Sequence, residues 1–149
     1  MHANNEIATK IPLKQIGDIC KEFDALFHSD TVQTMGHYAF DFQDLNIHFA
    51  TCSAHKFNGP KGIGFIYISN DVSIKPMITG GAQERNMRAG TENIYGIVGL
   101  TKALELAYED LEFHQKEILA IKSYMIKRLK ETIPDVFFNG DSELSLIHI

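Results

Sequence analysis

Three short apolar segments constrain the fold of this 149-residue chain more than any other feature. They cover residues 25–28, 48–52 and 64–68, and the first two lead into Ser29-Asp30 and Ser53-Ala54-His55-Lys56. Apolar runs of this length, rich in aromatic and β-branched residues, are typical of buried strands. An apolar face at helical spacing over residues 12–24 precedes them. Because strands that alternate with helices form parallel sheets, the sequence predicts an α/β fold.

The second half of the chain is predicted to be helical from about residue 92 to residue 133. Apolar residues recur there every seven positions, at Ile97, Leu104, Leu111, Ile118 and Met125. A straight helix over this segment would span about 60 Å at about 1.5 Å per residue, so we expect a bend or break within it. Pro134 ends the helix, and residues 136–138 are predicted to form a strand that enters a turn at residues 139–141.

Composition and charge argue against several classes of protein. The formal net charge is −5, whereas nucleic-acid-binding surfaces are basic. No apolar run reaches 18 residues, so we expect no membrane-spanning helix. Cys20 and Cys52 are too few for a disulfide scaffold, and the histidines show no zinc-ligand spacing with them, so no metal site is predicted. With no signal-peptide pattern at the N-terminus, we expect a cytoplasmic protein.

The polar residues that follow the first two strands are the candidate catalytic groups. Sites in α/β sheets lie at the carboxyl ends of strands, which brings Asp30 and Lys56 together. A partly desolvated lysine is a good amine nucleophile, although a lone lysine beside a loop is more often a solvated surface residue. Asp30 is suited to pair with a pyridinium nitrogen or to cap a helix beginning at Thr31. Gln33, one turn further, is either a ligand of a ring oxygen or a surface residue.

A second set of residues is suited to phosphate. The Ser53 hydroxyl and the His55 imidazole flank a strand end, although His55 is also compatible with a loop histidine that donates to backbone. Arg85 and Arg88, with Gly90-Thr91, form another candidate set or an ordinary exposed basic loop. Cys20 and Cys52 lie in apolar patterns and are expected to be small buried hydrophobes rather than nucleophiles.

Four motifs extend these local patterns to a family. In chain order they read HANNEIAT, ALFHSDTVQTMG, SAHKFNGPKGIGFIY and GGAQERNMRAGTENIYGIVGL. In sequence and spacing they resemble the cysteine desulfurases of the NifS/IscS type, within the class V aminotransferases. The resemblance implies part of a fold type I domain, aspartate-aminotransferase-like, with a mainly parallel sheet. Residues 1–111 would belong to the large domain that binds pyridoxal 5'-phosphate (PLP), and residues 112–149 to a connecting helix and the start of a small domain.

The resemblance also implies a role for each candidate residue. Lys56 would bind PLP covalently and then transfer protons, and Asp30 would pair with the pyridinium nitrogen. Asn5 and Gln33 would contact the oxygen side of the ring, and Ser53 and His55 would bind the phosphate. Thr91 would reach the phosphate in the partner subunit of a homodimer. The substrate implied is L-cysteine, converted to L-alanine, with the sulfur passed to an acceptor or Fe–S scaffold protein.

The chain also departs from the family pattern. The family's chains are longer at both ends, and the cysteine that accepts sulfur comes from a downstream loop that no residue here matches. Neither Cys20 nor Cys52 takes that role, so we expect the sequence to be a fragment that is inactive alone. The alternatives are another class V enzyme, such as a selenocysteine lyase or an aminotransferase, and a non-catalytic remnant that only folds or dimerises.

Overall fold

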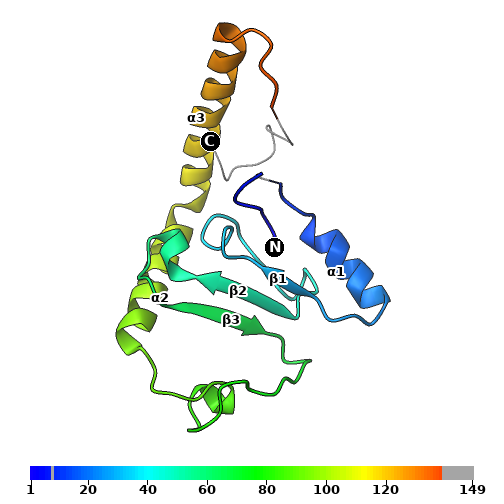
Figure 1. The fold of residues 1–149 in the computed structure, drawn as a ribbon, viewed down its shortest axis with the longest axis vertical. Helices are drawn as coiled ribbons and strands as arrows, with labels where there is room; N and C mark the ends of the chain where they lie inside the picture. Colours follow the sequence, from blue (N-terminus) through cyan, green and yellow to red (C-terminus); the bar gives the residue numbers. More distant parts are fainter. Residues whose placement is uncertain (8, 139–149) are drawn as a thin grey trace.

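The computed structural model describes residues 1–7 and 9–138. A small sheet forms its centre, with one helix at one end of the sheet and a long helical arm at the other (Figure 1). In chain order the elements are α1 (Leu13–Glu22), β1 (His28–Asp30), β2 (Phe49–Ser53), η1 (Ala54–Phe57), β3 (Gly64–Ile68), η2 (Glu84–Asn86), α2 (Ile94–Glu109) and α3 (Leu111–Thr132). Residues 139–141, where a turn was predicted, lie outside the described part of the chain.

The three strands form a mixed sheet in the order β1-β2-β3. β1 and β2 are parallel, but β2 and β3 are antiparallel, with Ser53 paired to Gly64. This part of the predicted sheet is therefore mixed, with one parallel pair and one antiparallel pair of strands. Only residues 54–63 connect β2 to β3, and a parallel crossover needs a dozen residues or more. The connection is too short for one, so β3 turns back alongside β2.

β1 begins later than the apolar pattern predicted. The prediction placed this strand over residues 25–28, whereas β1 starts at His28 and includes the polar Ser29 and Asp30. Leu26 is 64% exposed, so the apolar run is not buried as a whole. Phe27 is buried at the margin of the sheet, where its carbonyl accepts hydrogen bonds from the backbone N–H groups of His48 and Phe49.

One face of the sheet is covered by helices. Ala50 and Cys52 alternate along β2 and so point to the same face. Ala50 belongs to a buried cluster beneath α1, together with Leu13, Phe27 and Ile47. Cys52 belongs to a second cluster beneath α2, together with Met35, Ala54, Phe57 and Leu100. Ile66 of β3 lies on the other face and is 51% exposed, so the described residues leave that face open.

α1 matches the helix predicted at residues 12–24, and it lies close against a loop. Gly17 is buried in its middle, and a Cβ atom at this position would collide with the carbonyl oxygen of Leu45. Lys14 and Asp18 form an exposed ion pair of 2.8 Å on the outer side of the helix. Glycine is therefore required at position 17 by the close approach of the backbone of the loop.

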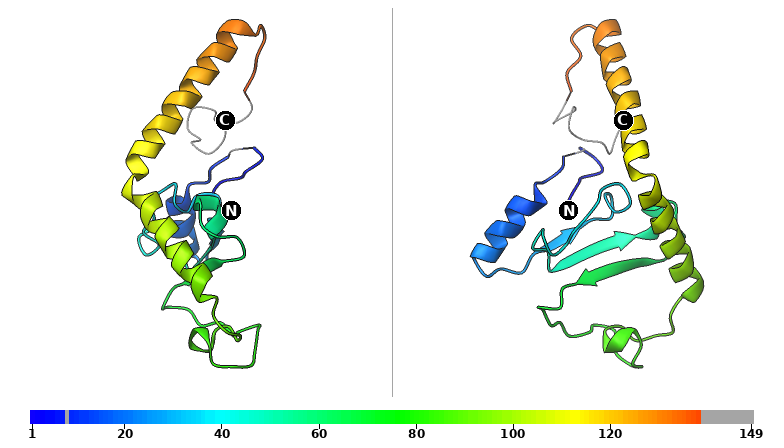
Figure 2. Two further views of the ribbon diagram at one scale, coloured as in Figure 1. Left: turned by 90° about the vertical axis from the view of Figure 1, so that its left-hand side faces the viewer. Right: turned by 180° about the vertical axis from the view of Figure 1, so that it is seen from behind.

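The predicted break in the long helix falls at Asp110, between α2 and α3. Asp110 has φ −113° and ψ 22°, which ends α2 and starts α3. α2 lies beside the sheet, whereas α3 projects away from it (Figure 2). α3 ends near Pro134 as expected, but residues 136–138 form no strand, because no described segment pairs with them. None of the described helices combines the length and the apolar character needed to cross a membrane.

Candidate active site

The site residues on β1 and β2 lie at one edge of the sheet because these two strands are parallel. Asp30, the last residue of β1, is paired with Thr51 of β2. Paired residues share a face, as do residues two apart along a strand, so Asp30 and Ser53 both lie on the open face. Thr31 fixes this register, since its backbone N–H and its hydroxyl both donate to the Thr51 carbonyl, at 3.0 Å and 2.8 Å.

The Asp30 carboxylate caps a turn in this structure. Its Oδ1 accepts a hydrogen bond of 2.9 Å from the backbone N–H of Val32. No helix starts there; the chain instead makes turns over residues 32–34 and 36–37. The local role anticipated for Asp30 is thus present, although the element that it caps is a turn. Gln33 lies half-buried in the same turn.

The residues that follow β2 form η1, a single short turn of 3₁₀ helix. Ala54 and Phe57 are 0% and 2% exposed and hold the turn against α2, whereas His55 and Lys56 point to solvent. Asn58 follows in the left-handed conformation, with φ 65°, and its backbone N–H donates to the Ala54 carbonyl. Lys56 is therefore an exposed side chain on a well-anchored backbone. The described residues do not bury its amine, so they do not provide the partial desolvation that was considered from the sequence.

The N-terminal segment approaches the same edge. The backbone N–H of His2 donates to the Asp30 carbonyl at 2.7 Å, and Ala3 forms an antiparallel bridge with Lys10. Asn5 lies exposed on the turn that follows, where its side-chain amide donates to Glu6 Oε1 at 3.1 Å. Asn5 is thus on a segment attached to Asp30, and its side chain bonds to the neighbouring Glu6.

Thr91 and the arginines lie apart from these residues. They belong to the segment that loops below β3 before α2 begins (Figure 1). Thr91 is exposed, and Arg88 donates to the nearby Gly90 carbonyl at 3.4 Å. Glu84, Arg85 and Asn86 all have positive φ, from 48° to 65°, so this loop is held in a conformation that side chains disfavour. Within one chain, the loop does not join the cluster around Lys56.

The two cysteines differ in accessibility, and neither lies beside Lys56 at the site edge. Cys52 is buried in β2, and burial raises the pKa of its thiol to about 11, which disfavours the reactive thiolate. Cys20 is partly exposed on α1, at the other end of the molecule. Across residues 1–7 and 9–138, no three His, Cys, Asp or Glu side chains are grouped so that they could hold a metal ion.

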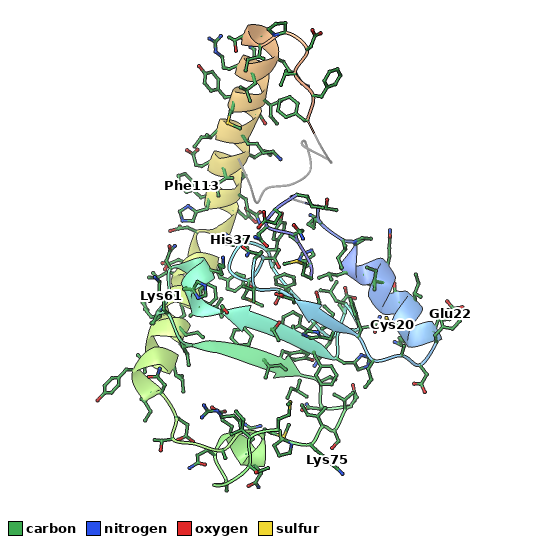
Figure 3. The ribbon with its side chains drawn as sticks, viewed as in Figure 1. Cys20, Glu22, His37, Lys61, Lys75 and Phe113 are labelled. Carbon is green, nitrogen blue, oxygen red and sulfur yellow. The ribbon has the colours of Figure 1, made fainter. Side chains whose placement is uncertain are left out.

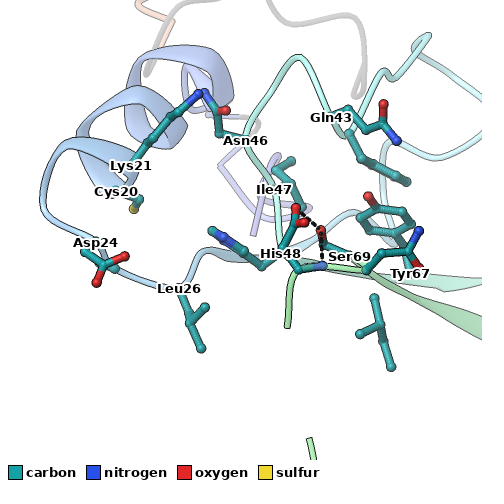
Figure 4. Close-up of a pocket in the computed structure, with 15 residues that line it drawn as sticks. Cys20, Lys21, Asp24, Leu26, Gln43, Asn46, Ile47, His48, Tyr67 and Ser69 are labelled. Carbon is teal, nitrogen blue, oxygen red and sulfur yellow. Dashed lines mark hydrogen bonds between the residues drawn. The ribbon is translucent and has the colours of Figure 1, made fainter. Parts of the chain in front are cut away.

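A separate pocket lies at the opposite edge of the sheet (Figure 4). It measures about 620 Å³, and its lining includes Leu26, which precedes β1, His48, which precedes β2, and Ser69, which follows β3. The Nδ1 atom of His48 accepts a hydrogen bond of 3.0 Å from the Phe27 N–H, so this ring also has a structural role. The pocket is distinct from the edge that carries Asp30 and Lys56.

Two histidines that sequence reasoning left aside organise the site edge. His2 is 7% exposed, its Nδ1 lies 3.0 Å from the Thr34 hydroxyl, and its ring meets the rings of Tyr38 and Phe40 edge-on. His37 contacts the backbone of Lys56. Both contacts join segments distant in sequence, so no local pattern signals them. The HANNE motif, which contains His2, was the one available sign.

The fold and the motifs together define the class of protein. The family model described as Aminotransferase class-V matches residues 1–148, and the chain belongs to this family. Within the family it is similar to proteins named cysteine desulfurase IscS. It is 48% identical over 145 residues to the one from Clostridium botulinum (strain Hall) and 49% identical over 140 residues to the one from Methanosarcina thermophila. These matches cover 97% and 94% of this chain, but the chain spans only 36% and 34% of those relatives.

Solved structures agree with this assignment. A NifS-like protein from Rickettsia africae superposes with a TM-score of 0.84 at 33% identity, over 93% of this chain and 40% of that one. Another NifS-like protein superposes with a TM-score of 0.83 at 42% identity, over 88% of this chain and 36% of that one. The resemblance read from the motifs is confirmed, and so is the expectation of an α/β chain that forms part of a fold type I domain.

Proposed function

We propose that this chain carries the cofactor lysine of a PLP-dependent cysteine desulfurase. The reaction would convert L-cysteine and an acceptor thiol into L-alanine and a persulfide. The C–S bond of the substrate breaks, an S–S bond forms on the acceptor, and the thiol proton is retained in the products. The observation that carries the proposal is the meeting of Asp30, Ser53, His55 and Lys56 at one edge of the sheet, which follows from the parallel pairing of β1 and β2.

The chemistry of these side chains fits PLP. The cofactor needs an amine for its aldehyde, a carboxylate for its ring nitrogen and hydrogen-bond donors for its phosphate. Lys56 is exposed and accessible as the amine. Asp30 uses Oδ1 for the Val32 N–H, which leaves its second carboxylate oxygen for a further contact. The Ser53 hydroxyl is not used to cap η1, so it remains available as a donor.

Each residue would then have a defined task. PLP, when bound, supplies a protonated ring that accepts electrons from the substrate. Asp30 would hold the proton on the ring nitrogen, because a carboxylate in contact favours the charged pyridinium. Lys56 would bind the cofactor and move a proton to and from the substrate carbon. Ser53 and His55 would bind the phosphate, and Asn5 and Gln33 would orient the oxygen side of the ring.

The position of Thr91 supports a homodimer in this proposal. Thr91 is exposed, and the loop that carries it lies below β3 rather than at the end of β2 that leads to Lys56, as is needed for a residue that serves the partner subunit's phosphate. The acceptor thiol would come from outside the described residues, since Cys52 is buried with its pKa raised to about 11 and Cys20 lies far from the site edge. A sulfur-acceptor or Fe–S scaffold protein would receive the sulfur in the cytoplasm. One solved relative, at 40% identity, is SspA in complex with cysteine, which favours L-cysteine as substrate.

Covalent trapping tests the lysine assignment. The chain is incubated with PLP, reduced with borohydride and mapped by mass spectrometry. We expect the label on Lys56, its loss in Lys56→Ala, and no change in the matched control Lys61→Ala, since Lys61 is exposed five residues away. A label on another lysine, or one that survives Lys56→Ala, contradicts the proposal.

Turnover is tested in a chimera, because the chain spans 36% of the Clostridium botulinum relative. In the chimera this chain replaces the matching segment of that protein, and alanine release from L-cysteine is measured. Lys56→Ala should reduce alanine release to background, and Asp30→Asn should slow it while leaving borohydride labelling at Lys56 intact. Normal alanine release in Asp30→Asn would show that Asp30 is only a turn cap.

A further inference from the structure

The carbonyl group of Lys56 receives a hydrogen bond from a distant segment. At the end of a short helix, the last carbonyls have no partner within the helix and need one from elsewhere. In η1 the Ala54 carbonyl is satisfied by the N–H groups of Asn58 and Gly59. The Lys56 carbonyl is instead 3.1 Å from Nε2 of His37, which lies 19 residues away in sequence. Because a carbonyl only accepts, Nε2 of His37 carries the proton and donates it.

His37 is itself held by the helical arm. Gln115, in the first turns of α3, donates its side-chain N–H to the His37 carbonyl at 2.6 Å. Tyr108, in the last turn of α2, donates its hydroxyl to the Tyr38 carbonyl at 3.1 Å. Figure 3 shows His37 beside the start of α3. Residue 37 is thus bonded to α3 and residue 38 to α2, the two helices that meet at the break at Asp110.

The core beneath this segment fixes it further. Gly36 has φ +79°, and a Cβ atom there would lie 2.7 Å from Cβ of Phe57, the residue after Lys56. Met35 and Phe57 belong to the same buried cluster. The turn that carries His37 and the turn that carries Lys56 therefore lie against each other through both backbone and core.

We propose that His37 is a positioning residue for Lys56: its Nε2–H fixes the Lys56 carbonyl and so aims the Lys56 amine toward the open face that carries Asp30 and Ser53. Through Gln115 and Tyr108, the same contact ties the break between α2 and α3 to the lysine. The inference rests on the proposed function, since it concerns how well Lys56 meets PLP.

The rate of PLP labelling at Lys56 in the full chain tests the inference, with Lys61 as the internal reference. In His37→Leu, the ratio of Lys56 to Lys61 labelling should fall about fivefold, the factor that corresponds to one net hydrogen bond. His37→Gln, which keeps a side-chain N–H donor, should restore much of the ratio. The matched control is His114→Gln, because His114 is an exposed histidine that does not contact Lys56.

A second measurement needs neither cofactor nor mutation. The ¹⁵N spectrum of the folded chain should show His37 with its proton on Nε2 at pH 8. A His37 ring protonated only on Nδ1 would overturn the inference.

The outcomes separate the two proposals. Preferential labelling of Lys56 that is unchanged in His37→Leu removes the positioning role and leaves the proposed function intact, even if that variant melts at a lower temperature. Labelling of Lys56 no faster than Lys61 in the unmodified chain removes the proposed function, and the positioning role with it.

Discussion

Replacement of Phe57 by alanine is the sharpest test of how the lysine-bearing turn is anchored. Phe57 is 2% exposed and contacts the cluster of Met35, Cys52, Ala54 and Leu100 beneath α2. Removal of a buried phenylalanine ring costs about 3–5 kcal/mol, from lost burial and from the cavity left behind. Gly36 packs directly against Cβ of Phe57, and the helix α2 contacts η1. The cavity left by the ring therefore has little freedom to collapse, so we expect the free energy of unfolding to fall by an amount in that range.

Urea unfolding followed by circular dichroism measures this loss as a shift in midpoint at constant slope. The matched control is Phe137→Ala, because Phe137 is 87% exposed and should change the free energy of unfolding by less than about 0.5 kcal/mol. Phe57→Leu, which keeps much of the side-chain volume, should lie between the two and provides a measurable variant if Phe57→Ala is unfolded without urea. A loss below about 1 kcal/mol in Phe57→Ala would refute the anchoring described here.

Three further predictions follow from individual residues. Gly17→Ala should lower the urea midpoint by the equivalent of about 1–3 kcal/mol, because its Cβ would meet the Leu45 carbonyl; a higher midpoint, as alanine gives in an open helix, would contradict the close approach. Burial, with help from the positive charge of Lys10, lowers the pKa of His2 from 6.5 to about 4. Between those two pKa values, the unfolded chain therefore binds a proton at His2 that the folded chain does not bind. Stability should fall, on the order of 2–3 kcal/mol, as the pH drops from about 6.5 to about 4. His2→Gln should show less of this fall, and identical pH profiles would exclude His2 as its source. With a disulfide reagent at pH 8, Cys20 should react first and Cys52 only on unfolding, since burial raises the Cys52 pKa; two equally fast thiols would contradict its burial.

Local patterns predicted the elements that depend on near neighbours. Leu13–Glu22 formed where the apolar face at residues 12–24 indicated a helix, and the long helical segment broke, as its length required. The ends of β1 and β2 lie at one edge because the chain between them, residues 31–48, is long enough for a parallel connection. Each of these features is encoded in spacing along the chain, so each was visible in the sequence.

Contacts between distant segments could not be predicted in this way. The apolar run at residues 64–68 has the same pattern at any place in a sheet, so it does not indicate that β3 lies on the edge of β2 opposite β1; only the ten-residue connection indicates that β3 runs antiparallel. The contacts of His37 with Lys56 and Gln115 join residues 19 and 78 positions apart. The role of Asn5 and the partner-subunit role of Thr91 came from the family resemblance alone, whereas Gln33 was a candidate only because it lies one turn after Asp30.

The antiparallel return of β3 also bears on the order in which the chain folds. Ser53 and Gly64 are partners, so Lys56 sits inside the ten-residue connection of a hairpin, residues 54–63. Hairpins of this kind close in about 1–10 μs, whereas pairings between more distant segments form more slowly. β1 and β2 are separated by residues 31–48, so we expect them to pair after the hairpin of β2 and β3 has closed. We therefore expect the backbone of the lysine-bearing turn to form first, and the carboxylate of Asp30 and the His37 contact to join it when β1 and residues 31–48 dock.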